Sequence, residues 1–132
     1  KHLARHKHAD LFIDTFNYNA HTTASDALWS GLPIVTKQGK QFSARVASSL
    51  LTACGLPELI TKNEKEYEEL IYELATNPKK LKTISLKLSE NKKSKPLFNT
   101  KQYTNNFEKG LQKAYDIYFY GEDPKNIFVS DN

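Results

Sequence analysis

The sequence contains no methionine and only one cysteine, Cys54, among its 132 residues. A single cysteine excludes an internal disulfide and a zinc site built from several cysteines. No apolar run approaches the roughly 20 residues that a membrane-spanning helix needs, and no charged-then-apolar leader supports secretion. Because a complete translated chain normally starts with methionine, whereas this sequence starts with Lys1, we expect a segment of a longer, cytoplasmic protein that has no membrane partner.

The overall composition is typical of one soluble globular domain. Hydrophobic residues make up 39% and charged residues 26% of the sequence, which suits a packed core and argues against disorder. Lys and Arg outnumber Asp and Glu by 19 to 15, and the basic residues gather in two clusters, 1–8 and 79–95. Either cluster could bind a polyanion. Acidic residues lie nearby and no nucleic-acid-binding motif is present, so we interpret the second cluster as a solvated helix surface and expect no nucleic-acid partner.

The first half of the sequence alternates between strand and helix patterns. Short apolar runs at 11–14, 33–36 and 59–60 predict buried parallel strands. Helices are predicted at 22–30, which Gly31 would close, and at 42–54, whose apolar face includes Cys54 as a core residue. This order predicts an α/β fold with a small parallel sheet. Three strands are few for such a sheet, so we expect its remainder upstream of Lys1.

The second half of the sequence predicts helices only. Asn63 and Glu66 form a capping-box pattern before one helix, and Asn77-Pro78 starts another. A polar linker is predicted at 91–95, and a long final helix begins at Asn99 or Thr100. We interpret the apolar stripe of this helix as part of the core, and a partner-docking face is the alternative. The stripe contains Tyr103, Phe107, Leu111, Ala114 and Tyr118.

The most informative segment lies between the first strand and the first helix. Ligands of open α/β folds bind beyond the carboxyl ends of the strands, and this loop leads directly into His21, Thr22 and Thr23. A helix start offers unpaired backbone N–H groups and a partial positive charge, to which two threonine hydroxyls add donors. These groups predict a phosphate site without a lysine or a glycine-rich loop. Asp26, one turn later, suits a ribose diol.

Structural roles are the alternatives for these residues. Thr22 or Thr23 could cap the helix, and Asp26 could interact with the helix dipole. The spacing of His2 and His6 would suit a metal on a helix, but neither a carboxylate nor a cysteine completes a ligand set. We therefore predict no metal site.

Three blocks of the sequence resemble the O-linked N-acetylglucosamine transferase and SPINDLY family of protein glycosyltransferases. The first is ADLFIDT at 9–15 followed by NAHTTASDALWSGLP at 19–33, the second is SARVASSLL at 43–51, and the third is PLFNTKQYT at 96–104. They occur in the family's order and cover about residues 1–120.

The resemblance implies the C-terminal, Rossmann-like lobe of a GT-B glycosyltransferase, with residues 1–120 as the C-terminal part of its nucleotide-sugar-binding lobe and 121–132 as a tail. It also implies an N-terminal lobe and tetratricopeptide repeats upstream, a protein acceptor, and a nucleotide sugar as co-substrate with no metal or other cofactor. By the family pattern, His2 lies against the base, Thr22 and Thr23 hold the diphosphate, and Asp26 binds the ribose. The positions that match the donor site are His2, Arg5, His21, Thr22, Thr23 and Asp26.

The implied reaction transfers N-acetylglucosamine from UDP-GlcNAc to serine or threonine side chains of proteins. Family members that use GDP-fucose, or that use UDP-hexose to modify asparagine, are alternatives, and the Asn17–Ala20 loop resembles these members more than the animal enzymes. No catalytic residue is assigned, because acceptor-side groups and a diphosphate-binding lysine lie upstream in the family, so the segment alone is expected to be inactive. An alternative of another class is a non-catalytic helical interaction module.

Overall fold

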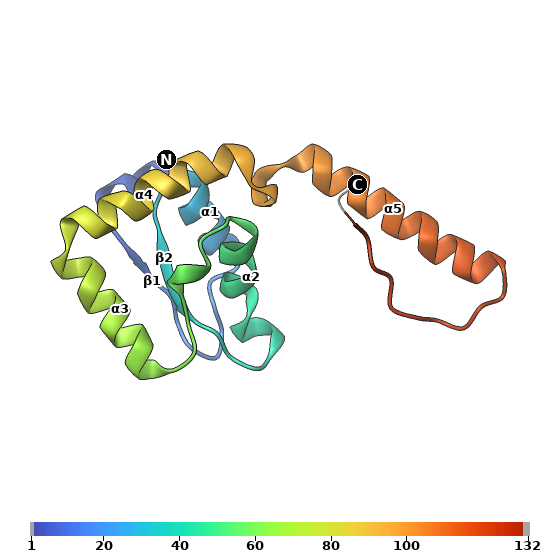
Figure 1. Ribbon diagram of the computed structural model, residues 1–132, viewed down its shortest axis with the longest axis horizontal. Coiled ribbons are helices and arrows are strands. Elements are labelled where there is room, and N and C mark those ends of the chain that lie inside the picture. The colour runs from blue at the N-terminus through green and yellow to red at the C-terminus, as the bar shows by residue number, and fades with distance from the viewer. Residues whose placement is uncertain (1, 131–132) are drawn as a thin grey trace.

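A computed structural model describes residues 2–130 of the chain (Figure 1). Its centre is a parallel sheet with the strand order β1-β2-β3. Phe12 pairs with Ile34 between the first two strands, and Thr36 pairs with Ile60 between the last two. Lys1 of the first basic cluster and the last two residues of the predicted tail lie outside the described residues. The strands are β1 (Phe12–Ile13), β2 (Ile34–Lys37) and β3 (Ile60–Thr61).

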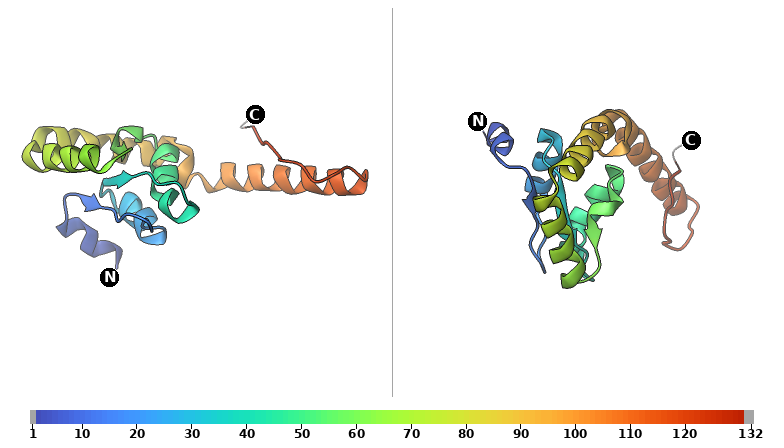
Figure 2. Two further views of the ribbon diagram at one scale, coloured as in Figure 1. Left: turned by 90° about the horizontal axis from the view of Figure 1, so that it is seen from below. Right: turned by 60° about the vertical axis from the view of Figure 1, so that its left-hand side comes forward.

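Helices cover both faces of this sheet (Figure 2). The crossover helices α1 and α2 follow β1 and β2 and lie on the same face of the sheet, as right-handed connections between parallel strands require. Helix α3 packs against β2 and β3, and α4 runs across the top of the body in Figure 1. The α-helices are α1 (Thr22–Ser30), α2 (Val46–Ala53), α3 (Glu64–Thr76), α4 (Pro78–Ser94) and α5 (Thr100–Phe119). Four short 3₁₀ helices are η1 (Leu3–His8), η2 (Phe42–Ala44), η3 (Pro57–Leu59) and η4 (Pro96–Phe98).

The hydrophobic core lies between the sheet and these helices. Leu28 of α1, Ile34 of β2, Leu51 of α2 and Leu88 of α4 are completely buried. Cys54 is also completely buried, which confirms its prediction as a core residue. Desolvation by burial raises the pKa of its thiol, and nearby Lys92 opposes that effect, so the thiol stays protonated and packs as a small apolar group.

Helix boundaries differ from the sequence prediction at two places. The helix predicted at 42–54 is split, because Arg45 has φ −126° and separates η2 from α2. The linker predicted at 91–95 is wrong, since α4 continues to Ser94. Asn91 within this segment donates two side-chain hydrogen bonds to the carbonyls of Cys54 and Gly55, at 2.9 and 3.1 Å. These contacts hold the last turns of α4 against the end of α2.

Helix α5 extends away from the body of the molecule (Figures 1 and 2). None of its residues is buried, so the interpretation of its apolar stripe as core is wrong for this chain. Tyr103, Phe107 and Leu111 are all exposed. The described tail returns along another side of the helix, where Lys113 Nζ donates to the carbonyl of Phe128 at 2.7 Å. The pattern predicted an amphipathic helix, but no described segment covers its apolar side.

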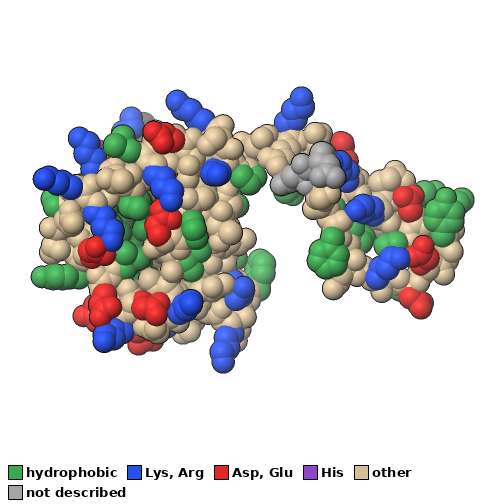
Figure 3. Space-filling model, in the orientation of Figure 1, with side chains coloured by type: hydrophobic (Ala, Val, Ile, Leu, Met, Phe, Trp, Pro, Cys, Tyr) green, Lys and Arg blue, Asp and Glu red, His purple; other side chains and the backbone are tan. Residues whose placement is uncertain are grey.

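Two of the basic residues of α4 pair with acidic side chains of neighbouring elements. Lys80 pairs with Glu73 at 2.5 Å, and Lys87 pairs with Glu58 at 2.5 Å. Figure 3 shows blue and red side chains interleaved over this face of the body. This arrangement supports the interpretation of 79–95 as a solvated surface. No helix among residues 2–130 is both long and apolar enough to cross a membrane.

Candidate functional site

The start of α1 has no side-chain cap. His21 is the residue that precedes the helix, and its side chain makes no capping hydrogen bond. The first helical bond runs from the amide of Ser25 to the carbonyl of His21, at 3.1 Å. The amides of Thr22, Thr23 and Ala24 precede this bond and therefore have no acceptor within the helix. Neither threonine caps the helix, so the capping alternative is not observed.

Both threonine side chains at this helix start are exposed. Neither hydroxyl bonds to another residue in the described part of the chain. The unpaired amides of the exposed residues Thr22 and Thr23, their two free hydroxyls and the positive end of the helix dipole therefore lie together at one helix start. Such a group of donors is suited to an anion that carries several oxygen acceptors, such as a phosphate.

Asp26 lies one turn further along α1 and contacts His2. The His2 Nε2 atom and the Asp26 Oδ2 atom are 3.2 Å apart. Because a carboxylate only accepts, Nε2 carries the proton in this bond. The Asp26 side chain is 32% exposed, so its other oxygen remains accessible to a hydroxyl donor. The structure thus brings together two predicted residues that are far apart in the sequence.

Arg5 is the predicted residue that the structure leaves most separate. Arg5 lies exposed on η1, which packs against α1. The carbonyl of Leu3 in η1 accepts a hydrogen bond of 3.5 Å from Ser30 Oγ at the end of α1. The Arg5 guanidinium makes no bond to any residue between 2 and 130.

The same range holds no group of three or more His, Cys, Asp or Glu residues that could bind a metal ion.

His21 is held in place from three sides. Its ring stacks on Tyr18 with the centroids 4.7 Å apart, and the ring of Phe42 meets it edge-on at 6.0 Å. His21 Nε2 lies 3.4 Å from the carbonyl of Ser43, which can only accept, so Nε2 is the donor. The other ring nitrogen, Nδ1, is left for a ligand or for solvent. The histidine is therefore oriented before any ligand binds.

The loop before His21 is anchored by a residue that the sequence did not identify as part of the site. Asp14 is buried at the end of β1. Its carboxylate accepts from the amide of Ala20 at 2.7 Å and from the hydroxyl of Thr36 at 2.6 Å. Its backbone carbonyl accepts from the Tyr67 hydroxyl at 2.5 Å. The only signal in the sequence was an acidic residue ending an apolar run, which does not reveal these partners.

A second set of bonds joins the same loop to η2. The amide of Asn19 donates to the carbonyl of Ser43 at 2.8 Å, and its side chain donates to the carbonyl of Thr15 at 2.9 Å. Ser43 Oγ donates in return to the carbonyl of Asn17 at 2.9 Å. Asn17 itself has φ +62°, a left-handed conformation that asparagine tolerates better than most residues. The loop is thus closed by its own polar side chains.

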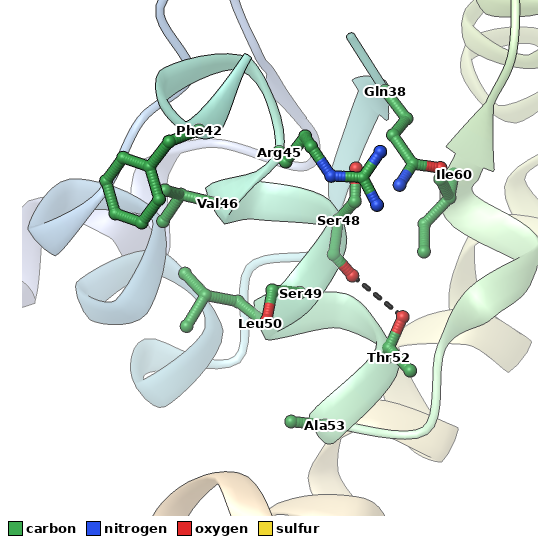
Figure 4. A pocket seen from close by; sticks show the side chains of 10 residues that line it. All are labelled: Gln38, Phe42, Arg45, Val46, Ser48, Ser49, Leu50, Thr52, Ala53 and Ile60. Atoms are coloured by element: carbon green, nitrogen blue, oxygen red, sulfur yellow. Dashed lines mark hydrogen bonds between the residues drawn. The ribbon is translucent and has the colours of Figure 1, made fainter. Parts of the chain in front are cut away.

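A separate groove of about 670 Å³ lies along the outer side of α2 (Figure 4). Figure 4 shows Phe42, Val46 and Leu50 on one side and Arg45 beside Gln38 on the other. Ser48 also lines the groove, and its buried hydroxyl has no partner within the described residues. None of the six predicted donor-site residues lines this groove, so it is distinct from the start of α1.

A parallel sheet with an uncapped helix start at its carboxyl edge is an arrangement of open α/β folds, whose ligands bind beyond the carboxyl ends of the strands. Comparison with known proteins gives the particular family. The sequence pattern of Glycosyl transferase family 41 matches residues 1–107, and the chain belongs to this family. The predicted family resemblance is therefore confirmed.

Individual relatives agree with this assignment. The chain is 35% identical, over its whole length, to the probable UDP-N-acetylglucosamine–peptide N-acetylglucosaminyltransferase SEC of Arabidopsis thaliana, and covers 14% of it. It is 36% identical to the UDP-N-acetylglucosamine–peptide N-acetylglucosaminyltransferase of Caenorhabditis elegans, over 92% of this chain and 10% of that protein. A SPINDLY protein of Petunia hybrida is 33% identical over 93% of this chain and 13% of its own length.

The fold agrees with a solved structure as well. A mutant of the O-GlcNAc transferase of Thermobaculum terrenum aligns with a TM-score of 0.67 and 34% identity, over 70% of this chain and 18% of that one. The predicted fold class, a small parallel sheet with helices from a GT-B glycosyltransferase, is confirmed. The chain spans between a tenth and a seventh of the length of the three relatives from Arabidopsis, Caenorhabditis and Petunia.

Proposed function

We propose that this chain is the donor-binding part of a protein glycosyltransferase that transfers N-acetylglucosamine from UDP-GlcNAc to serine and threonine side chains. The observation that carries the proposal is the open start of α1, where Thr22 and Thr23 present free hydroxyls beside unpaired amides. Membership of family 41 and similarity to two UDP-N-acetylglucosamine–peptide N-acetylglucosaminyltransferases support the choice of donor.

Each predicted residue has a place in this proposal. The diphosphate lies at the start of α1, where Thr22 and Thr23 donate to its oxygens and His21 faces the donor. The ribose hydroxyls donate to the free oxygen of Asp26, while His2 lies against the base and Arg5 lies near the nucleotide. No metal ion is required, because the helix start itself supplies donors for the anion. The upstream lobe provides the acceptor-side groups.

The same groups explain how the lobe would assist the reaction. When the bond between the sugar and the diphosphate breaks, negative charge accumulates on the diphosphate. Fixed donors at a helix start stabilise this charge more strongly in the transition state than in the bound substrate. The acceptor is a protein in a cytoplasmic setting, and tetratricopeptide repeats upstream are the proposed element that selects it. Residues 121–132 are proposed as a tail outside the lobe.

The test is the double substitution Thr22→Ala/Thr23→Ala in the full-length protein. Removing donors of this kind typically lowers the rate by about 100-fold or more, so we expect a loss of at least that size in turnover and weaker nucleotide binding. A matched control is Thr76→Ala/Thr83→Ala, which removes two exposed threonine hydroxyls from α3 and α4. Turnover of the double Thr22/Thr23 variant equal to that of the control would reject the proposal.

The choice of donor is tested separately with nucleotides. Titration of the full-length protein with UDP and with GDP, followed by thermal unfolding, should show stabilisation by UDP only, because a ligand stabilises the state that binds it. Stabilisation by GDP alone would favour the fucosyltransferase alternative while leaving the role of α1 intact. UDP-GlcNAc and UDP-glucose are then compared as substrates to distinguish O-linked transfer of N-acetylglucosamine from transfer of a hexose to asparagine.

A further inference from the structure

We propose that Asp14 is a positioning residue of the donor site, whose carboxylate determines which backbone amides at the start of α1 remain open for the ligand. The inference rests on the proposed function, because it assumes that the open amides bind a diphosphate. Asp14 does not belong to the six predicted residues, and it acts on the ligand only through the backbone that it holds.

The position of Asp14 makes this role possible. It lies directly after β1 and is only 3% exposed. Oδ1 accepts from the amide of Ala20 at 2.7 Å, and Oδ2 accepts from the hydroxyl of Thr36 on β2 at 2.6 Å. One carboxylate thus connects the ends of two neighbouring strands to the residue that immediately precedes His21. The place where the chain enters α1 is fixed relative to the sheet.

The bonds of the loop also separate used amides from open ones. The amide of Asn19 is taken by the carbonyl of Ser43, and the amide of Ala20 is taken by Asp14. The next unpaired amides are those of His21 and of the first three residues of α1. Without the carboxylate, the amide of Ala20 would lose its acceptor, and the junction between loop and helix could change its direction and its pairing.

The backbone of Asp14 is held as firmly as its side chain. The Tyr67 hydroxyl on α3 donates to the carbonyl of Asp14 at 2.5 Å, and the Tyr67 ring packs edge-on against Phe16 with the centroids 5.0 Å apart. A bond from a backbone N–H to an ionised carboxylate is stronger than one between neutral groups. A buried carboxylate is costly unless all of its bonds are made, and here both oxygens are satisfied by protein donors.

The experiment compares three variants of the full-length protein by nucleotide titration, with UDP and GDP as probes. Asp14→Ala removes the acceptor of Ala20 and should weaken nucleotide binding by about tenfold or more. Asp14→Asn keeps one side-chain oxygen for Ala20 and should stay within about threefold of the parent protein. Asn91→Ala is the control, because it removes two hydrogen bonds to the backbone near Cys54 and should lower thermal stability without changing affinity.

Hydrogen exchange of the unliganded protein provides a readout that does not depend on the nucleotide. Peptides that cover residues 15–24 should exchange faster in Asp14→Ala than in the parent, while peptides of α4 should not change. If Asp14→Ala gives no cooperative unfolding transition, Thr36→Val and Thr36→Ser replace it. The valine removes one bond to Asp14 and should weaken binding several-fold, and the serine keeps the hydroxyl and should restore it.

Two outcomes would overturn the role of Asp14. One is nucleotide affinity in Asp14→Ala equal to that of Asn91→Ala, and the other is unchanged exchange of residues 15–24. If Thr22→Ala/Thr23→Ala loses binding in the same titration while Asp14→Ala does not, this inference fails and the proposed function stands. If the double threonine variant binds normally, the proposed function fails, and hydrogen exchange still reports whether Asp14 fixes the loop.

Discussion

At the level of single residues, two carboxylates near the carboxyl edge of the sheet have opposite surroundings. Asp14 is buried, and donors of the protein occupy both of its oxygens. Asp26 is partly exposed, and the structure gives it one partner, His2. A saturated carboxylate can hold the backbone but has no oxygen free for a ligand, whereas a partly exposed one can accept from a hydroxyl. These surroundings suit Asp14 to a scaffold role and leave Asp26 able to take the ribose-binding role proposed above.

The role of Asp26 predicts a specific dependence on the ribose. Asp26→Ala in the full-length protein should weaken UDP binding by about tenfold, equivalent to about 1.4 kcal/mol. The parent should bind 2′-deoxy-UDP less tightly than UDP, and Asp26→Ala should bind the two nucleotides equally, because the acceptor of the 2′-hydroxyl is gone. Calorimetric titration measures both constants. An Asp26→Ala variant that still distinguishes the two nucleotides as the parent does would remove the ribose role.

Tyr67 predicts a pH dependence of stability. Burial, and to a lesser extent the Asp14 carboxylate, raise the pKa of Tyr67 from 10.0 to about 12. Between these values the unfolded chain loses the phenolic proton while the folded chain keeps it, so stability that is fully present below pH 10 is lost as the pH rises towards 12. Its contribution is on the order of 2 kcal/mol.

The difference between two denaturation series isolates this residue. Urea unfolding of the parent chain and of Tyr67→Phe at several values between pH 9 and 12 should show a steeper loss in the parent. Tyr72→Phe, at an exposed tyrosine on the same helix, is the control and should follow the parent. Equal slopes for the parent and Tyr67→Phe would contradict the raised pKa.

At the level of elements, the helices fall into two groups according to how they begin. The last three α-helices each start with an asparagine whose side chain accepts from a backbone amide: Asn63 for α3, Asn77 for α4 and Asn99 for α5. Neither α1 nor α2 has such a cap. A helix without a cap leaves donors unsatisfied, and α1 does so at the edge of the sheet where ligands of this fold class bind.

This contrast predicts which substitutions cost stability. Asn63→Ala and Asn77→Ala should each lower the free energy of unfolding by about 1 kcal/mol, the usual cost of losing a cap. Thr22→Ala and Thr23→Ala should each change it by less than about 0.5 kcal/mol, because neither hydroxyl bonds to the protein. Urea denaturation of the isolated chain measures all four. A threonine variant as unstable as the asparagine variants would show that the hydroxyl has a structural role after all.

The sequence predicted most elements because their signals are local. The bounds of α1, its end at Gly31 in a left-handed conformation with φ +91°, and the capping residue of α3 follow from neighbouring residues and agree with the structure. The linker predicted at 91–95 was wrong because α4 continues through this segment. The bonds of Asn91 to the distant end of α2 hold it there, and no local sequence pattern reveals them. In the site, the residues of α1 were predictable for the same reason, while the contacts of Asp14 with Thr36 and Tyr67 required the tertiary structure. The six donor-site residues remain a prediction.

At the level of the whole molecule, the chain consists of a packed body and one helix that contributes nothing to its core. Leu97 and Phe98 of η4 pack against the core cluster, whereas α5, directly after them, has no buried residue. Trp29 and Phe98 also meet edge-on with their centroids 5.1 Å apart. Among the described residues, the packed body therefore ends at η4, and α5 continues the chain beyond it.

Truncation tests this division. A chain that ends at Asn99 should unfold cooperatively within about 2 °C of the 132-residue chain, because the removed segment buries almost no apolar surface of the body. A chain that ends at Ser94 also loses Leu97 and Phe98, which are partly buried against the core, and should unfold several degrees lower, because it loses part of the roughly 2–5 kcal/mol that a fully buried side chain of this size contributes. Circular dichroism melts of the three chains measure the effect. An unfolding temperature for the chain ending at Asn99 as low as that of the shorter chain would show that α5 stabilises the body directly, and the exposed stripe from Tyr103 to Tyr118 would then have to contact it in solution.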